Sequence, residues 1–115
     1  MAMYIGDMFM RMSVGTPANF YSPSFERGGL SATFAIEVFN LMGTSPTLEC
    51  TIEHKNHDDT SFTSAGTFSS MNVAAVWKVD VSALKEQIRL VITVGGSAAS
   101  NTVYANVLAP IWRPY

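Results

Sequence analysis

The sequence predicts an all-β protein built as a single antiparallel β-sandwich, with a jelly-roll or immunoglobulin-like layout. Apolar and polar residues alternate in several runs, which is the pattern of strands that have one buried face. Clusters of Gly, Pro, Asn, Asp and Ser separate these runs and are typical of turns. The length of 115 residues suits one domain, because dividing it would leave neither half with an adequate core.

The first two clear strands lie in the middle of the chain. Residues 31–42, SATFAIEVFNLM, and residues 47–55, TLECTIEHK, both alternate with period two. Residues 43–46, GTSP, lie between them, where Gly tolerates positive φ and Pro lacks a backbone donor. The three segments together predict an antiparallel hairpin.

The next segments predict a turn, two strands and a short helical link. The polar run NHDDTS at 56–61 favours a turn, because Asn and Asp side chains bond to nearby backbone groups. Residues 61–70 give a weak edge-strand pattern, and residues 73–81, VAAVWKVDV, give a convincing strand. Residues 82–87, SALKEQ, contain good helix formers but are too few for more than a helical turn.

A second hairpin is expected near the C-terminal end. Residues 88–94, IRLVITV, and residues 101–109, NTVYANVLA, alternate on either side of the glycine-containing loop at 95–100. Residues 110–115 contain two prolines, which disfavour both a helix and an interior strand. An extended tail is therefore expected there.

The expected organisation has three parts: residues 1–30 form an apolar N-terminal arm or a first strand plus loop, residues 31–109 form the sandwich core, and residues 110–115 form the tail. Five of the seven methionines lie in the first twelve positions. These residues either complete the domain's own core or pack on a partner, since Met and aromatic side chains suit both roles. The candidate partner-interface residues are Met3, Tyr4, Met8, Met10, Met12, Phe20, Tyr21, Phe25, Trp112 and Tyr115.

Composition argues against several classes of partner. The formal net charge of −2 gives no basic surface for phosphates, so direct binding to nucleic acid is not expected. No window approaches the roughly 20 apolar residues of a membrane-spanning helix, and the N-terminus lacks the pattern of a signal peptide. Cys50 is the single cysteine, so it cannot form an intramolecular disulfide.

No constellation of residues predicts catalysis, a metal site or a cofactor. The polar run EHKNHDD at 53–59 contains two histidines, but adjacent strand residues point to opposite faces. A solvated turn is the favoured interpretation of this run. Cys50 and His54 share a strand face but stand about 13 Å apart, too far for a nucleophile and its base.

Aromatic residues leave a sugar-binding function open as the alternative. Trp77, Tyr104 and Trp112 could stack on sugar rings if they were exposed on a sandwich. Trp77 shares a face with Val79 and Val81, which favours a core position for it.

The segment WKVDVSALKEQIRLVITVGGSAASNTVYANVLAP at 77–110 resembles the C-terminal half of small β-sandwich proteins encoded among bacteriophage virion genes, including capsid decoration or cement proteins. Residues 48–70, LECTIEHKNHDDTSFTSAGTFSS, resemble the strand-turn-strand that precedes it in those proteins. The resemblance implies a non-enzymatic structural protein at the capsid surface, made in the host cytoplasm. Its implied partners are the major capsid protein or other virion subunits, in a homo-oligomer or another symmetric assembly.

Overall fold

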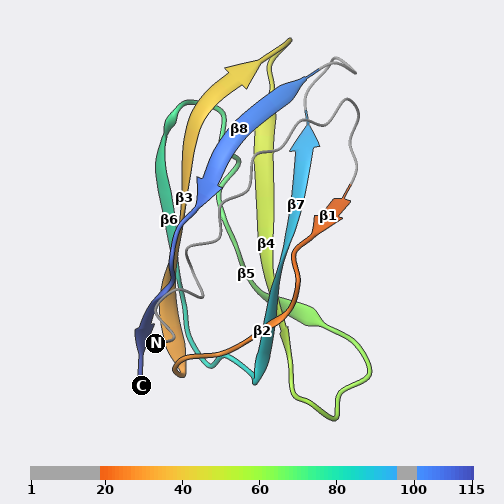
Figure 1. Cartoon of the computed structure of the whole chain (residues 1–115), viewed down its shortest axis with the longest axis vertical. Helices are drawn as coiled ribbons and strands as arrows, with labels where there is room; N and C mark the ends of the chain where they lie inside the picture. The colour runs from red at the N-terminus through yellow and green to blue at the C-terminus, as the bar shows by residue number, and fades with distance from the viewer. Residues whose placement is uncertain (1–18, 96–100) are drawn as a thin grey trace.

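The computed structural model describes residues 19–95 and 101–115, which form two antiparallel sheets packed face to face (Figure 1). The prediction of an all-β sandwich is confirmed. Within these residues no helix is long and apolar enough to cross a membrane.

The sheet that we call the β7 sheet has β7 and β4 at its centre. β7 pairs with β4 on one side and with β1 and β2 on the other, and β5 pairs with the free side of β4. The strands of this sheet are β1 (Asn19–Tyr21), β2 (Phe25–Glu26), β4 (Thr47–Lys55), β5 (Thr63–Thr67) and β7 (Gln87–Gly95).

The opposing sheet, called the β3 sheet, has the long strand β3 at its centre. β6 pairs with one side of β3, while β8 and then β9 pair with the other side. Its strands are β3 (Ser31–Met42), β6 (Ala75–Val81), β8 (Thr102–Val107) and β9 (Ile111–Arg113).

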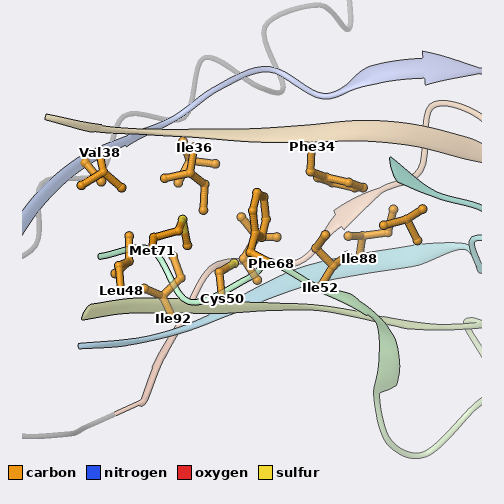
Figure 2. Close-up of a cluster of buried hydrophobic side chains, with 14 of the residues drawn as sticks. Phe34, Ile36, Val38, Leu48, Cys50, Ile52, Phe68, Met71, Ile88 and Ile92 are labelled. Carbon is orange, nitrogen blue, oxygen red and sulfur yellow. The ribbon is translucent and has the colours of Figure 1, made fainter. Parts of the chain in front are cut away.

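The core lies between the two sheets and is made by the inward positions of the alternating strands. Figure 2 shows side chains of β3 facing side chains of the β7 sheet across this space; the labelled residues of these strands are Phe34, Ile36, Val38, Leu48, Cys50, Ile52, Ile88 and Ile92. Each of them is almost completely buried. Burial of one such large apolar side chain stabilises the fold by about 1.5–3 kcal/mol, which makes this layer the main source of stability.

Both predicted hairpins are wrong in their pairing, although their strands are present. β3 and β4 belong to different sheets, and so do β7 and β8. The segment at 43–46 therefore connects one sheet to the other, and β8 lies in the sheet opposite β7. A four-residue segment spans up to about 14 Å, which is enough to cross the roughly 10 Å between packed sheets, so turn residues alone do not distinguish a hairpin from a crossover.

The hairpin in this part of the chain is formed by β4 and β5. Their antiparallel pairing confirms the turn predicted at 56–61 and the edge strand predicted within 61–70. The register shifts between Ile52 and Glu53, where the pairing contains a bulge or a similar irregularity.

The helical turn expected at 82–87 is wrong. The chain crosses there from β6 to β7 without regular structure, and Ala83 adopts a φ of 55°, in the left-handed region. Leu84 is buried, and its backbone N–H donates to the carbonyl of Leu30 at 2.9 Å. Residues 82–87 have good helix propensity, but the chain buries Leu84 in the core and does not form the helical turn.

Candidate binding surfaces

The sequence-selected residues Met3, Tyr4, Met8, Met10 and Met12 lie outside the described residues. The remaining five occupy short strands at the margins of the two sheets, or follow them. Phe20 and Tyr21 are in β1, Phe25 is in β2, Trp112 is in β9, and Tyr115 lies beyond β9. The structure brings Phe25 and Trp112 into contact with each other, although they belong to opposite sheets.

Phe25 and Trp112 face inward and pack against the core. Their rings meet edge to face at 6.5 Å, and Trp112 makes a second edge-to-face contact with Phe34 at 6.1 Å. Gly28 lies against the indole, since a Cβ at this position would come within 2.8 Å of its ring atoms. This close approach holds Trp112 against Phe25 and Phe34, where its half-buried ring covers part of the core.

Phe20, Tyr21 and Tyr115 retain large exposed areas, and Tyr115 is 79% exposed. Ser31 donates a side-chain hydrogen bond to the backbone carbonyl of Tyr115, which places the chain beside the start of β3. All three therefore contribute apolar surface outside the core.

A set of apolar side chains on the outer face of the β3 sheet was missed by the sequence interpretation. Five of them are exposed, and Tyr104 is half-buried. We call this set the β3-sheet outer patch. Its members come from β3, β6, β8 and β9 or directly follow β8, and they are Phe39, Met42, Val76, Tyr104, Leu108 and Ile111. The signal that could have found it is the presence of apolar residues such as Phe39 and Val76 at positions where the alternation calls for polar ones.

A bulge in β3 positions Phe39 in the β3-sheet outer patch. The pairing of β3 with β8 shifts between Val38 and Asn40, so Phe39 is an extra residue in β3. Its ring stacks on that of Tyr104 in β8, with centroids 6.2 Å apart and an interplanar angle of 25°. The bulge thus turns an aromatic side chain onto the sheet surface beside a second aromatic ring.

Polar groups surround Ile111, a strongly exposed member of the β3-sheet outer patch. The Arg113 guanidinium donates to Thr33 Oγ1 at 2.9 Å and lies 3.8 Å from an oxygen of Asp80. Thr33 in turn donates to the Asp80 carboxylate. Polar side chains also lie among the apolar ones on this face, since Glu37 is opposite Val76 and accepts a hydrogen bond from Asn106. A mixed apolar and polar surface is the composition of a non-obligate protein interface.

Trp77, considered above for sugar binding, is half-buried against the core. Its indole N–H donates to the carbonyl of Val73 at 3.2 Å, which fixes the ring. The core position predicted for Trp77 is therefore confirmed. Tyr104, the other β-strand candidate, lies on the outer face.

The two histidines occupy different environments and do not converge. His54 is buried at the inner face of β4, where its Nδ1 accepts a hydrogen bond from the backbone N–H of Lys85 at 3.1 Å. His57 is exposed in the β4–β5 loop, and its Nε2 lies 3.1 Å from Glu26 Oε1. In the described segments, no group of three or more His, Cys, Asp or Glu side chains is placed to hold a metal ion.

Cys50 lies in the core, also on the inner face of β4. Burial raises the pKa of its thiol from 9.0 to about 12, so the thiol stays protonated at neutral pH. A protonated, buried thiol is a poor nucleophile. Cys50 thus acts as a small apolar side chain.

No known protein-family model matches this sequence, and a search of curated proteins found no match either.

Proposed function

We propose that this chain is a non-enzymatic structural protein of a virion, of the capsid decoration or cement type. It would stabilise the shell through contacts with the major capsid protein or other virion subunits. The β3-sheet outer patch is the observation that carries this proposal. The resemblance of residues 48–70 and 77–110 to small phage sandwich proteins supports it independently.

Single exposed apolar residues are normal on soluble proteins, but five exposed apolar residues and a half-buried tyrosine on one sheet face form a surface suited to burial. The patch combines two stacked aromatic rings with aliphatic side chains, and aromatic residues are enriched in protein interfaces. A protein that binds the assembled shell and not its separate subunits stabilises that shell by mass action, without any chemistry.

The test is co-sedimentation of the purified protein with purified phage-type capsid shells, after light scattering has given its mass in solution. We expect saturation at a fixed ratio of protein to shell subunits. Ile111→Lys and Val76→Lys should each weaken binding at least about tenfold, because each places a charge in an apolar interface. Thr67→Lys is the matched control: it adds the same charge to the exposed edge strand of the β7 sheet, and it should bind like the unmodified protein.

The N-terminal segment is tested separately by deletion of residues 1–12. If the Met-rich segment forms an arm, the deletion weakens attachment to shells while circular dichroism still reports a folded β-domain. Full attachment by the truncated protein would contradict the arm hypothesis and leave the β3-sheet outer patch as the docking surface. Failure of the unmodified protein to sediment with any shell would contradict the decoration function.

A sugar-binding module is the second candidate function, and the stacked pair of Phe39 and Tyr104 favours it. Two adjacent aromatic rings on a sheet surface offer a platform for a sugar ring. Tyr104→Ala should then abolish binding in a glycan screen, while Trp77→Ala should act only through stability. A stable monomer that ignores shells but binds a glycan would favour this second function.

A further inference from the structure

The outer face of the β7 sheet differs in character from that of the β3 sheet, because polar side chains dominate it. Arg89 lies near its centre on β7, directly opposite Glu53 of β4 in the strand register. The Arg89 Nε donates to Glu53 Oε1 at 2.8 Å. This ion pair fixes one edge of the guanidinium group.

Two aromatic rings contact the Arg89 guanidinium. Its Cζ lies 4.6 Å from the ring centroid of Tyr21 in β1 and 4.2 Å from that of Phe62, at the end of the β4–β5 loop. Contact with an aromatic ring attracts the cation and restricts its rotation. Three segments distant in sequence thus contact one arginine and restrict its orientation.

The terminal nitrogens of Arg89 make no hydrogen bond to any of the described residues, although 29% of the side chain is exposed. A guanidinium has five N–H donors, so most of its donor capacity is unused here. These free N–H groups lie beside half-buried neighbours and are oriented before any ligand arrives.

A second cation lies close by. The Lys55 ammonium is 5.5 Å from the ring centroid of Phe62, and it donates to the backbone carbonyl of Asp59 at 3.2 Å. The Asp59 carboxylate lies 3.8 Å from Lys85 and accepts from the backbone N–H of Asn56. Arg89 and Lys55 thus place two cations on this face, where the outward carboxylates come from Glu53 and Glu49 of β4 and from Glu26 of β2. An anion would therefore be recognised through the oriented N–H donors of Arg89 and not through an excess of positive charge.

We propose that this face binds the carboxylate of an acidic sugar, such as a hexuronic or sialic acid residue, at Arg89. The open edge of a guanidinium matches a planar carboxylate and can bind it through two parallel hydrogen bonds. The half-exposed ring of Tyr21 lies next to that edge and offers a surface for the sugar ring. Neighbouring outward side chains such as Gln87 can bond to sugar hydroxyls.

A sugar is favoured over an acidic segment of a protein because of the composition of this face. The core of a protein interface is depleted in charged residues, whereas Glu53, Arg89 and Lys55 lie together here. The site goes beyond the proposed function and does not depend on it. The outer faces of the two sheets point to opposite sides of the sandwich, so a molecule docked through the β3 sheet keeps this site accessible (Figure 1).

The test is an NMR titration of the full chain that follows the Arg89 side-chain N–H resonances. The probes are glucuronate, N-acetylneuraminate, methyl glucoside as a neutral sugar, and N-acetylglutamate as a carboxylate without a sugar ring. We expect a saturable shift with at least one of the two acidic sugars. Methyl glucoside and N-acetylglutamate should bind at least about tenfold more weakly, since each lacks one part of the recognition.

Variants separate recognition from folding. Arg89→Lys keeps the charge but loses the planar fork, and should weaken binding of the acidic sugar at least about tenfold. Glu53→Gln removes the competing carboxylate and should strengthen it several-fold. Lys78→Gln, which removes one positive charge from the β3 sheet, is the matched control and should leave it unchanged.

Three outcomes would overturn the proposal. Without a saturable shift from either acidic sugar, the site does not exist. Equal binding of N-acetylglutamate would show that a carboxylate without a sugar ring is sufficient. Equal binding of methyl glucoside would show that Arg89 does not recognise the carboxylate of the acidic sugar. The titration of the unmodified protein stays decisive even if Arg89→Lys fails to fold.

Discussion

Asn101, which directly precedes β8, is hydrogen-bonded to Thr44 in the connection from β3 to β4. The Thr44 backbone N–H donates to Asn101 Oδ1 at 2.9 Å, and the Asn101 amide donates back to the Thr44 carbonyl at 3.2 Å. The same amide donates to the carbonyl of Gly95 at 3.1 Å. One side chain, 2% exposed, thus ties the end of β7 and the start of β8 to the β3–β4 connection.

We expect Asn101→Ala to lower the free energy of unfolding by about 2 kcal/mol, because it removes three hydrogen bonds from a partly buried junction. Urea denaturation followed by tryptophan fluorescence measures this change. Asn72→Ala, at an exposed position, is the matched control and should change stability by less than about 0.5 kcal/mol. Similar stability of the two variants would contradict the role assigned to Asn101.

Gly43 completes this junction and should not tolerate a side chain. Its φ is 125°, and a Cβ would lie 2.0 Å from Asn101 Oδ1. Gly43→Ala should therefore destabilise the protein by more than about 1 kcal/mol, through backbone strain and displacement of the Asn101 side chain. An unchanged melting temperature of Gly43→Ala would show that the loop can adopt another conformation without loss of stability.

Trp112→Ala should destabilise the sandwich by about 2–3 kcal/mol, somewhat less than for a fully buried tryptophan, because the indole is half-buried against Phe34 and Phe25. Ile111→Ala is the matched control in the same strand. Ile111 is 65% exposed, so its truncation should cost less than about 0.5 kcal/mol in the same denaturation experiment. Equal losses for the two variants would show that β9 contributes through its backbone pairing alone.

Stability should fall as the pH drops through 6.5, owing to His54. Burial lowers the pKa of His54 below its usual 6.5, the nearby Lys85 lowers it further, and Asp59 opposes the shift. The unfolded chain then binds a proton that the folded protein excludes, so the free energy of unfolding decreases below that pH. Protonation would also remove the acceptor for the Lys85 N–H.

Denaturation at a series of pH values measures this effect. His54→Asn offers an amide oxygen as a neutral acceptor and should flatten the decrease, whereas His57→Asn should retain it. An unchanged pH profile in the His54 variant would show that other groups control the acid sensitivity.

Cys50 should resist thiol reagents in the native protein, because burial raises its pKa to about 12 and denies access to the sulfur. Labelling by a disulfide reagent should proceed only as fast as the protein opens, and should become rapid in denaturant. Fast, stoichiometric labelling of the native protein would contradict the burial of Cys50.

The alternation of residues predicted the strands well. The observed limits of β3 and β4 coincide with the predicted runs at 31–42 and 47–55. Alternation identifies the buried face of a strand but says nothing of its neighbours, so the crossovers before β4 and after β7 were taken for hairpins. Asn101 illustrates the difficulty. It stabilises the fold through hydrogen bonds to Thr44, a residue distant in the sequence, and no local pattern links the two.

The candidate surfaces could be predicted only in part. Tyr21 was selected as an aromatic residue at a chain end, and the structure places it against Arg89. Arg89 itself resembled an ordinary polar position of a strand, because its contacts come from β1 and the β4–β5 loop. Trp112 was selected for a partner, and the structure shows its ring packed against the core.

The position of β9 has a consequence for synthesis on the ribosome. β9 pairs with the beginning of β3, and β8 pairs with the rest of the same edge. Strand β3 therefore cannot complete its pairing until segments some seventy positions later have been translated. Until then its backbone groups on that side stay unpaired. Such a nascent chain exposes a strand edge open to wrong pairing, and folding should finish only after residues 102–113 leave the exit tunnel.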